Sequence, residues 1–185
     1  MSDWFTTLPG LWTQAWQLLG RGTADNRHAF HTFGLSTVAP DGTPRARMVV
    51  LRGASQSEGS LTVQTDATSA KIAELSDNPA AALLFWDRKS GLQIRARARV
   101  TVLTGEAVQQ DWDALSDGAA LNYGGRPTPG TPIDDPHDYE ETAERARLAV
   151  LRAEVLQADI LHLGQMHRRA VYDRADGFAG TWLAP

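Results

Sequence analysis

Apolar and polar positions change their period several times along the chain, and each change predicts a new element. Residues 9–20 carry apolar side chains at helical spacing, and Gly20 is a suitable stop. From Ala29 apolar and polar residues alternate, and after a turn at 40–44 a second extended run covers 45–52, which predicts a hairpin. An amphipathic helix followed by paired strands is therefore expected at the start of the chain.

The middle of the chain alternates between strands and one helix. Residues 61–65 and 80–86 are predicted strands, and the helix between them, at 70–75, follows several N-cap candidates and stops at Asn78-Pro79. The longest alternation covers 92–103 and predicts a strand with one polar and one apolar face. Its polar face carries Gln93, Arg95, Arg97 and Arg99.

The last third of the chain is expected to mix helices, a loop and strands. Residues 106–116 predict a short helix, and 118–137 predict a loop because four glycines and four prolines fall within them. Residues 139–150 predict a helix in which Glu141 and Arg145 are spaced for an ion pair. The remaining predicted strands are 155–163, 170–174 and 180–183, the first of which also fits a helical period.

These elements favour a mainly β fold, an antiparallel β-barrel with helices between its strands. About six or seven short strands, mostly joined as hairpins, are typical of such barrels. A doubly wound fold needs repeated strand–helix units, and only 61–75 offers one. With 185 residues the chain is expected to form a single domain, 1–185, with an N-terminal helical segment at 1–27 and a Gly/Pro-rich loop at 118–137.

Composition narrows the classes of function. A net charge of −4 without a basic stripe argues against nucleic acid or an anionic membrane surface as a partner. The absence of cysteine excludes disulfides and thiolate chemistry, and the scattered histidines lack the acidic neighbours of a metal site, so no metal is expected. With no basic, apolar leader and no apolar run of about 18 residues, a cytoplasmic protein without a membrane span is expected.

Basic side chains nevertheless predict a local anion site. Ser69 and Lys71 open the predicted helix, where free N–H groups and the positive end of the helix dipole attract anions and otherwise disfavour lysine. Arg47 shares a strand face with Val49 and Leu51, so its guanidinium needs an acidic partner or a phosphate. A solvated surface lysine and an arginine paired with an acid are the alternative interpretations.

Strand parity separates other candidates from this site. Arg52 falls on the face opposite Arg47, so one anion cannot engage both directly. The three arginines of 95–99 are expected on a solvated face. Gln93, at the start of the same strand, is left as a candidate polar contact to a ligand because its amide both donates and accepts hydrogen bonds.

Five segments, in this order, resemble the pyridoxamine 5′-phosphate oxidase-like family of FMN-binding split barrels. The likeness covers most of 28–104 and resumes weakly at about 155–185. It implies an antiparallel split β-barrel, FMN as cofactor, and a homodimer that binds FMN at the subunit interface. The segments are Arg47-Met-Val-Val-Leu-Arg52, Gln64-Thr65 with Ser69-Ala-Lys71, Asn78-Pro-Ala-Ala-Ala-Leu-Leu-Phe-Trp86, Gln93-Ile-Arg-Ala-Arg-Ala, and His167-Arg-Arg169 with Trp182-Leu-Ala-Pro185.

The resemblance also implies roles for individual residues. Arg47, Ser69 and Lys71 would hold the FMN phosphate, Gln93 would reach the ring from the other subunit, and Arg169 matches a late FMN-binding arginine. Two positions, Arg52 and His167, match the substrate side of the family's site, and no catalytic residue is implied. The remaining FMN-binding positions are Met48, Val49, Val50, Arg52, Gln64 and Thr65.

Departures from the family pattern keep several functions open. Ala70 stands where the family has a second phosphate-binding arginine, Gln64 replaces a tyrosine, and 111–118 lack the arginine that holds the substrate phosphate in true oxidases. The resemblance therefore favours an FMN-dependent oxidoreductase of the oxidase-related branch, with hydride transfer through flavin N5 to or from an unidentified small substrate. The alternatives are a genuine pyridoxamine/pyridoxine 5′-phosphate oxidase, a non-enzymatic flavin-binding protein, a barrel that has lost FMN, and a barrel that binds a deazaflavin.

Overall fold

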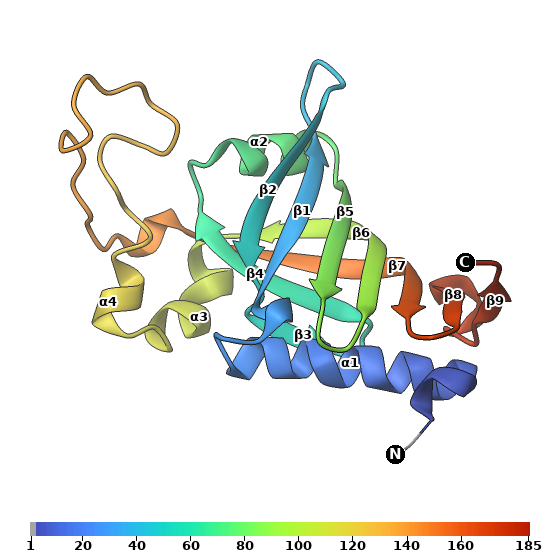
Figure 1. The fold of residues 1–185 in the computed structure, drawn as a ribbon. Coiled ribbons are helices and arrows are strands. Elements are labelled where there is room, and N and C mark those ends of the chain that lie inside the picture. Colours follow the sequence, from blue (N-terminus) through green and yellow to red (C-terminus); the bar gives the residue numbers. More distant parts are fainter. Residues whose placement is uncertain (1–2) are drawn as a thin grey trace.

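The computed structural model describes residues 3–185, whose strands form one antiparallel sheet that curls into a barrel (Figure 1). Along the sheet the strand order is β2-β1-β5-β6-β7-β4-β3, and β8 and β9 extend it from β7. The strands are β1 (Thr32–Val38), β2 (Pro44–Val50), β3 (Gly53–Ser55), β4 (Ser60–Asp66), β5 (Ala80–Asp87), β6 (Leu92–Leu103), β7 (Leu148–Leu163), β8 (His167–Asp173) and β9 (Thr181–Leu183).

Helices lie at the two ends of the barrel and along the connections. The long helix α1 lies below the barrel in the view of Figure 1 and α2 above it, whereas α3 and α4 flank a long loop. The α-helices are α1 (Leu8–Ala24), α2 (Ala70–Asp77), α3 (Gln109–Asp113) and α4 (Asp117–Ala120), and the 3-10 helices are η1 (Trp4–Thr6), η2 (Ala29–His31), η3 (Gly105–Val108), η4 (Arg145–Arg147) and η5 (Arg174–Asp176).

The core forms between the inner faces of the strands and one face of α1. Leu11, Ala15 and Leu19 are buried at helical spacing on α1. The helix is also fixed to β8, because the Tyr172 hydroxyl donates a hydrogen bond to the Leu8 carbonyl, 2.8 Å away. The ring of Trp12 lies 4.9 Å from that of Tyr172, so this tryptophan packs on the core, as expected for an apolar helix face.

The period-two strands agree with the sequence patterns. The hairpin of β1 and β2 pairs Leu35 with Arg47 and Thr37 with Arg45. Strand β6 has the predicted bounds and alternates buried apolar residues with exposed arginines. This alternation leaves the arginine row on the outer face of the sheet.

Several boundaries differ from the predictions. Helix α1 continues through Gly20, the predicted stop, and ends at Ala24. Gly20 has no neighbour on its outer side, whereas Gly22 packs against the backbone of Phe30 and so extends the contact of the helix with the barrel. The predicted strand 45–52 ends at Val50, and the short β3 that follows had no sequence signal. The Gly/Pro-rich loop begins three residues later than predicted, after α4.

The predicted helix at 139–150 is wrong. Only 145–147 form a helical turn, and Leu148 starts β7, a 16-residue strand between β4 and β6. Arg145 pairs with Glu106 instead of Glu141, which removes the intrahelical ion pair that motivated the prediction. The ion pair of Arg145 with a distant acid and the pairing of β7 with strands on both sides outweighed the local helical pattern of 139–150.

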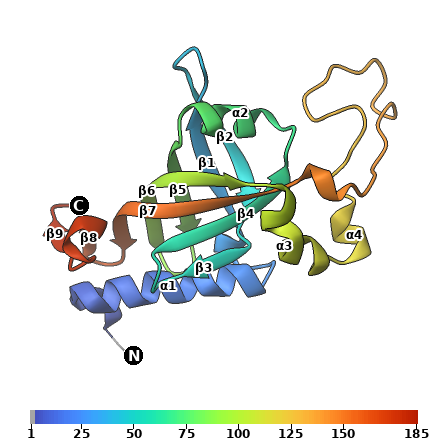
Figure 2. The same cartoon turned by 180° about the vertical axis from the view of Figure 1, so that it is seen from behind.

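The loop between α4 and η4 projects away from the barrel. Figures 1 and 2, seen from opposite sides, both place it on the side opposite β8 and β9. Within residues 3–185, no helix combines the length and the apolar character needed to cross a membrane.

Candidate functional site

Residues of the predicted anion site come together where β4 meets α2. The Lys71 ammonium donates to the hydroxyls of Thr65, 2.8 Å away, and Ser69, 3.0 Å away. Both hydroxyls are buried, and the Ser69 hydroxyl in turn donates to the Asp66 carbonyl at 2.7 Å. We call Arg47, Thr65, Ser69 and Lys71 the Lys71 cluster.

The Lys71 cluster keeps donors available for a ligand. An ammonium has three N–H bonds, and the two hydroxyls use two of them. Ser69 is the N-cap of α2, yet its side chain forms no capping hydrogen bond to the first N–H groups of this helix. A lysine donor beside uncapped helix N–H groups is the arrangement that binds a phosphate.

Arg47 extends from β2 toward the same place. Burial lowers the pKa of Lys71, and the charge of Arg47 lowers it further. Arg47 also forms an ion pair with Glu74 of α2, with Nη2 2.8 Å from Oε2, and donates to the Thr37 hydroxyl. The sequence left open whether Arg47 pairs with an acid or binds an anion. In the structure, Arg47 pairs with an acid and also acts on Lys71 of the candidate anion site.

The two cations and Glu74 leave this corner with a net charge of +1, before the half-exposed Arg45 is counted. Burial raises the pKa of Glu74, but the hydrogen bonds from Thr37 and Arg47 lower it by more. The pKa therefore lies below its ordinary value, and the carboxylate stays ionised. Arg45 approaches the other carboxylate oxygen at 3.8 Å. The corner therefore favours an anion even though it contains a buried acid.

A second group of predicted residues lies on the outer face of the sheet. The register places Trp86 opposite Gln93, Gln93 opposite Leu161, and Leu161 opposite Arg169, so that one row crosses β5, β6, β7 and β8. His167 shares the outer face of β8 with Arg169 by strand parity. We call these five residues the outer-face patch: Trp86, Gln93, Leu161, His167 and Arg169.

Apolar side chains surround the polar members of the outer-face patch. Trp86 is 44% exposed, and Leu84 and Leu163 are also exposed on the same face. Arg169 is engaged within the chain, because it holds Asp159 through Nε at 3.0 Å and Nη2 at 2.7 Å, and Arg95 shares the same carboxylate. Within residues 3–185, no hydrogen bond or ion pair joins this patch to the Lys71 cluster.

The predicted substrate residues lie apart from each other. Arg52 follows β2 and lines an open groove with His31 and the end of α1. It also lies beside Tyr123, whose pKa is raised by burial and partly lowered again by the guanidinium. His167 instead starts β8 opposite Leu163. The buried Tyr123 hydroxyl beside Arg52 had not been predicted to be part of the site.

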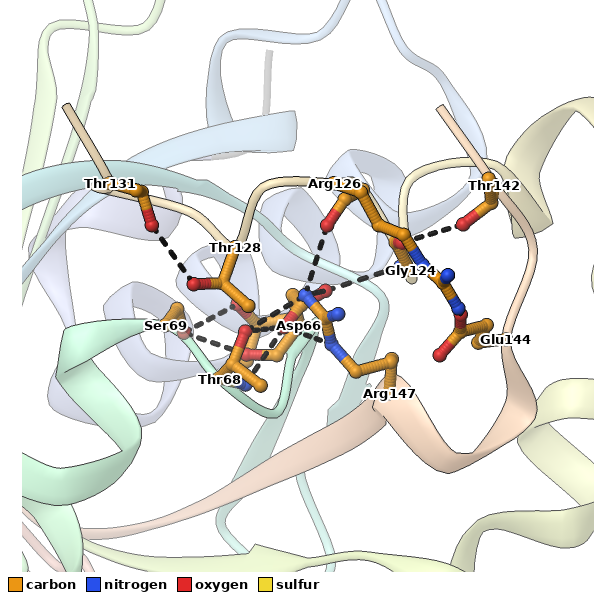
Figure 3. A network of polar contacts seen from close by, with 12 residues as sticks. Asp66, Thr68, Ser69, Gly124, Arg126, Thr128, Thr131, Thr142, Glu144 and Arg147 are labelled. Carbon is orange, nitrogen blue, oxygen red and sulfur yellow. Dashed lines mark hydrogen bonds and ion pairs between the residues drawn. The ribbon is translucent and has the colours of Figure 1, made fainter. Parts of the chain in front are cut away.

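Asp66 connects the Lys71 cluster to the long loop (Figure 3). Its carboxylate accepts hydrogen bonds from Arg147 through Nε at 3.1 Å and Nη2 at 2.8 Å, and from the amide of Gly124 at 3.2 Å. Tyr123 precedes that amide. The base of the loop, the start of α2 and the neighbourhood of Arg52 are therefore held together by one buried acid.

The other predicted FMN positions have mixed orientations. The side chain of Val49 belongs to the core, so only its backbone faces a ligand, whereas Met48 is 64% exposed. Val50 and Gln64 are half-buried. Four residues of this region, Thr37, Glu74, Asp66 and Tyr123, had not been predicted, because their contacts depend on partners that lie between 10 and 81 residues away or on burial.

Comparison with known proteins points to one family. Residues 11–104, about half of the chain, match the family model described as pyridoxamine 5′-phosphate oxidase, FMN-binding domain. The pyridoxine/pyridoxamine 5′-phosphate oxidase of Microcystis aeruginosa is 37% identical over 90 residues, which cover 49% of this chain and 41% of that protein. The chain thus spans less than half the length of the curated relatives it matches first.

Solved structures confirm the predicted split-barrel fold. A pyridoxamine 5′-phosphate oxidase-related, FMN-binding protein of Nostoc punctiforme superposes with a TM-score of 0.78 at 27% identity, covering 94% of this chain and 97% of that one. PhzG of Burkholderia lata, solved with tetrahydrophenazine-1-carboxylic acid, gives a TM-score of 0.74 at 19% identity, covering 94% and 91%. The family model also confirms FMN as the predicted cofactor, because the matched domain is an FMN-binding domain.

Proposed function

The chain belongs to the family of pyridoxamine 5′-phosphate oxidase FMN-binding domains, and from this premise we propose that it is an FMN-dependent oxidoreductase. The observation that carries the proposal is the Lys71 cluster, which has the donors, the charge and the burial that a phosphate requires. Arg47, Ser69 and Lys71 hold the phosphate in this proposal, and Thr65 orients the lysine. When bound, FMN supplies hydride transfer at N5.

The outer-face patch supplies the other side of the cofactor site in a homodimer. Gln93 and Arg169 lie beside exposed apolar side chains, with the charged Arg95 and Asp159 next to them, and exposed apolar surface bordered by polar residues is typical of protein interfaces. In the proposed dimer, the patch of one copy covers the flavin whose phosphate is held by the Lys71 cluster of the other copy. Residues 1–185 as one domain and the cytoplasmic location remain predictions.

The protein's own contribution is to bind and orient the flavin and to exclude water. Backbone groups of Met48 and Val49 are available to a ring lying along β2, since Val49 directs its side chain into the core. Gln93, with an amide that donates and accepts, suits the pyrimidine edge of the ring. No side chain needs to act as an acid or base for hydride transfer.

A genuine pyridoxamine or pyridoxine 5′-phosphate oxidase is the second candidate function. It is favoured by Arg52 beside the Tyr123 hydroxyl, because this pair offers donors to an anionic substrate. It is weakened at 111–118, where α3 and the start of α4 contain acids and no arginine.

An absorption spectrum of the purified protein, followed by titration with FMN, tests the proposal. Flavin bands near about 370 and 450 nm that co-purify or appear on titration support it. Stopped-flow reduction by NADH, NADPH and pyridoxamine 5′-phosphate then separates the two candidate functions. If no flavin binds, or a bound flavin is not reduced by any of a broad substrate panel, the proposed oxidoreductase is wrong.

A further inference from the structure

A buried acid lies beside the proposed phosphate site, where it would repel the ligand. Glu74 is 3% exposed and lies on α2, one turn after its start. It forms no direct contact with Lys71 among the hydrogen bonds of residues 3–185. Glu74 therefore has a role in this region other than direct contact with an anion.

Glu74, Thr37 and Arg47 form a closed ring of hydrogen bonds whose direction is fixed. An arginine can only donate, so the Thr37 hydroxyl accepts from Arg47 and gives its own proton to the Glu74 carboxylate. The same carboxylate oxygen accepts from Nη2 of Arg47 at 2.8 Å. Thr37 is itself 2% exposed, so the ring is shielded from water.

The ring orients one edge of the guanidinium and leaves the rest available. Its contacts use Nη1 and Nη2, and Nη1 also lies 3.5 Å from the Leu35 carbonyl. Nε–H and one Nη2–H have no partner among the described residues, and the side chain remains 23% exposed. A guanidinium held at one edge presents its other donors in a fixed direction, which reduces the entropy lost on binding.

We propose that Thr37 and Glu74 are positioning residues that set Arg47 for the FMN phosphate. The inference rests on the proposed function, in which Arg47 contacts that phosphate. Neither residue touches the ligand. Their effect is selectivity for a phosphorylated flavin over the same flavin without phosphate.

The test compares FMN with riboflavin, which has the same ring and ribityl chain but no phosphate. Dissociation constants for both ligands are measured by flavin fluorescence for the wild-type protein and for the Thr37→Val and Glu74→Gln variants. We expect the preference for FMN over riboflavin to fall about tenfold in each variant, since a charge-assisted bond of this kind contributes about that factor. Thr37→Ser, which keeps the hydroxyl, is expected to restore the preference, and Thr101→Val, the same exchange at an exposed position of β6, controls for the loss of a strand hydroxyl.

The sign of the Glu74→Gln result separates positioning from simple electrostatics. Glutamine keeps the size and an acceptor but removes a negative charge near the phosphate. If Glu74 only adds charge, its removal raises the preference for FMN, and a preference that rises or stays unchanged in both variants overturns the inference. Thr37→Val removes no charge, so it decides the question even if Glu74→Gln does not fold. A wild-type protein without any preference for FMN would instead overturn the proposed function.

Discussion

The Lys71 cluster and the outer-face patch are built in opposite ways. Three of the four residues of the cluster, Thr65, Ser69 and Lys71, fall within seven positions of the chain, and hydrogen bonds already hold these three together. The patch is assembled by the register of four strands and lies on an exposed face. Among the described residues, the polar contact of this patch is the ion pair of Arg169 with Asp159, which lies on the same outer face and within one chain.

This difference indicates that one half of the site is finished within a single chain and the other half is not. A preorganised cluster loses little freedom when an anion binds. In the proposed dimer, the exposed row of a tryptophan, an amide and an arginine contributes to the site when the second copy covers it. We therefore expect changes in the cluster to affect the phosphate alone, and changes in the patch to affect assembly or the ring.

The largest effect is expected when the outer-face patch receives a charge. Trp86→Asp places an unpaired carboxylate in the proposed interface, which costs about 3–5 kcal/mol and weakens dimerisation at least about 100-fold. Light scattering after size-exclusion chromatography is expected to show a dimer for the wild type and a monomer for the variant. Ile133→Asp, an exposed apolar residue of the loop, is the control. A dimeric Trp86→Asp protein would contradict the proposed interface.

The next effect comes from the Lys71 cluster. Lys71→Met keeps the length of the side chain but loses the ammonium, and FMN affinity is expected to fall about 100-fold while riboflavin affinity changes little. The chain's other lysine, Lys89, is exposed on the turn after β5, so Lys89→Met is a matched control. Isothermal titration with both ligands checks the result. An equal loss for both flavins would mean that Lys71 supports the fold and not the phosphate.

A smaller effect is expected from pH. Burial and Arg47 lower the pKa of Lys71 below its ordinary 10.5, so the ammonium loses its proton earlier than a free lysine would. The FMN phosphate is a dianion above about pH 7, so FMN affinity is expected to fall roughly tenfold as pH rises from about 7 to 10. The ratio of FMN to riboflavin affinity removes effects on the shared ring. A ratio that stays constant with pH in the wild type, or falls equally in Lys71→Arg, would exclude Lys71 as the titrating group.

The same depressed pKa links Lys71 to folding, with a defined sign. Since the folded state disfavours the charged ammonium, stability without ligand is lower when Lys71 is charged and rises as pH increases from the lowered pKa toward 10.5. Phosphate binding reverses this preference.

The smallest effect is expected from Gln93→Ala. Gln93 offers one neutral amide to the ring, so its loss is expected to weaken FMN and riboflavin equally, by about threefold, and to shift the flavin absorption bands. Fluorescence titration and difference spectra measure both changes. Gln110→Ala, at an exposed position of α3, is the control. A loss confined to FMN would place Gln93 near the phosphate and remove the contrast between the two regions.

The sequence predicted the parts of the fold that depend on local pattern. Strand β6 alternates over most of its length because one face packs on the core, and Ser69 before an amphipathic run is typical of a helix start. The error at 139–150 has the opposite origin. Arg147 forms an ion pair with Asp66, 81 residues away, and Arg145 forms one with Glu106. A local sequence pattern cannot show such long-range partners.

The candidate site divides in the same way. The residues of the Lys71 cluster could be named from the sequence and the family resemblance because they lie at a strand end and a helix start. Glu74 and Thr37 could not, because an acid in a helix and a threonine in a strand are ordinary surface residues in the sequence. The register of β1 and β2 brings Thr37 to Arg47, and the packing of α2 brings Glu74 to both.

A crystal structure of the protein with FMN bound tests the division of the site most directly. We predict a dimer in which the FMN phosphate lies within hydrogen-bond distance of Lys71 Nζ and Arg47 of one copy, while Gln93 of the other copy contacts the ring. An FMN whose phosphate lies away from Lys71, or whose phosphate and ring contacts all come from one chain, would contradict this account.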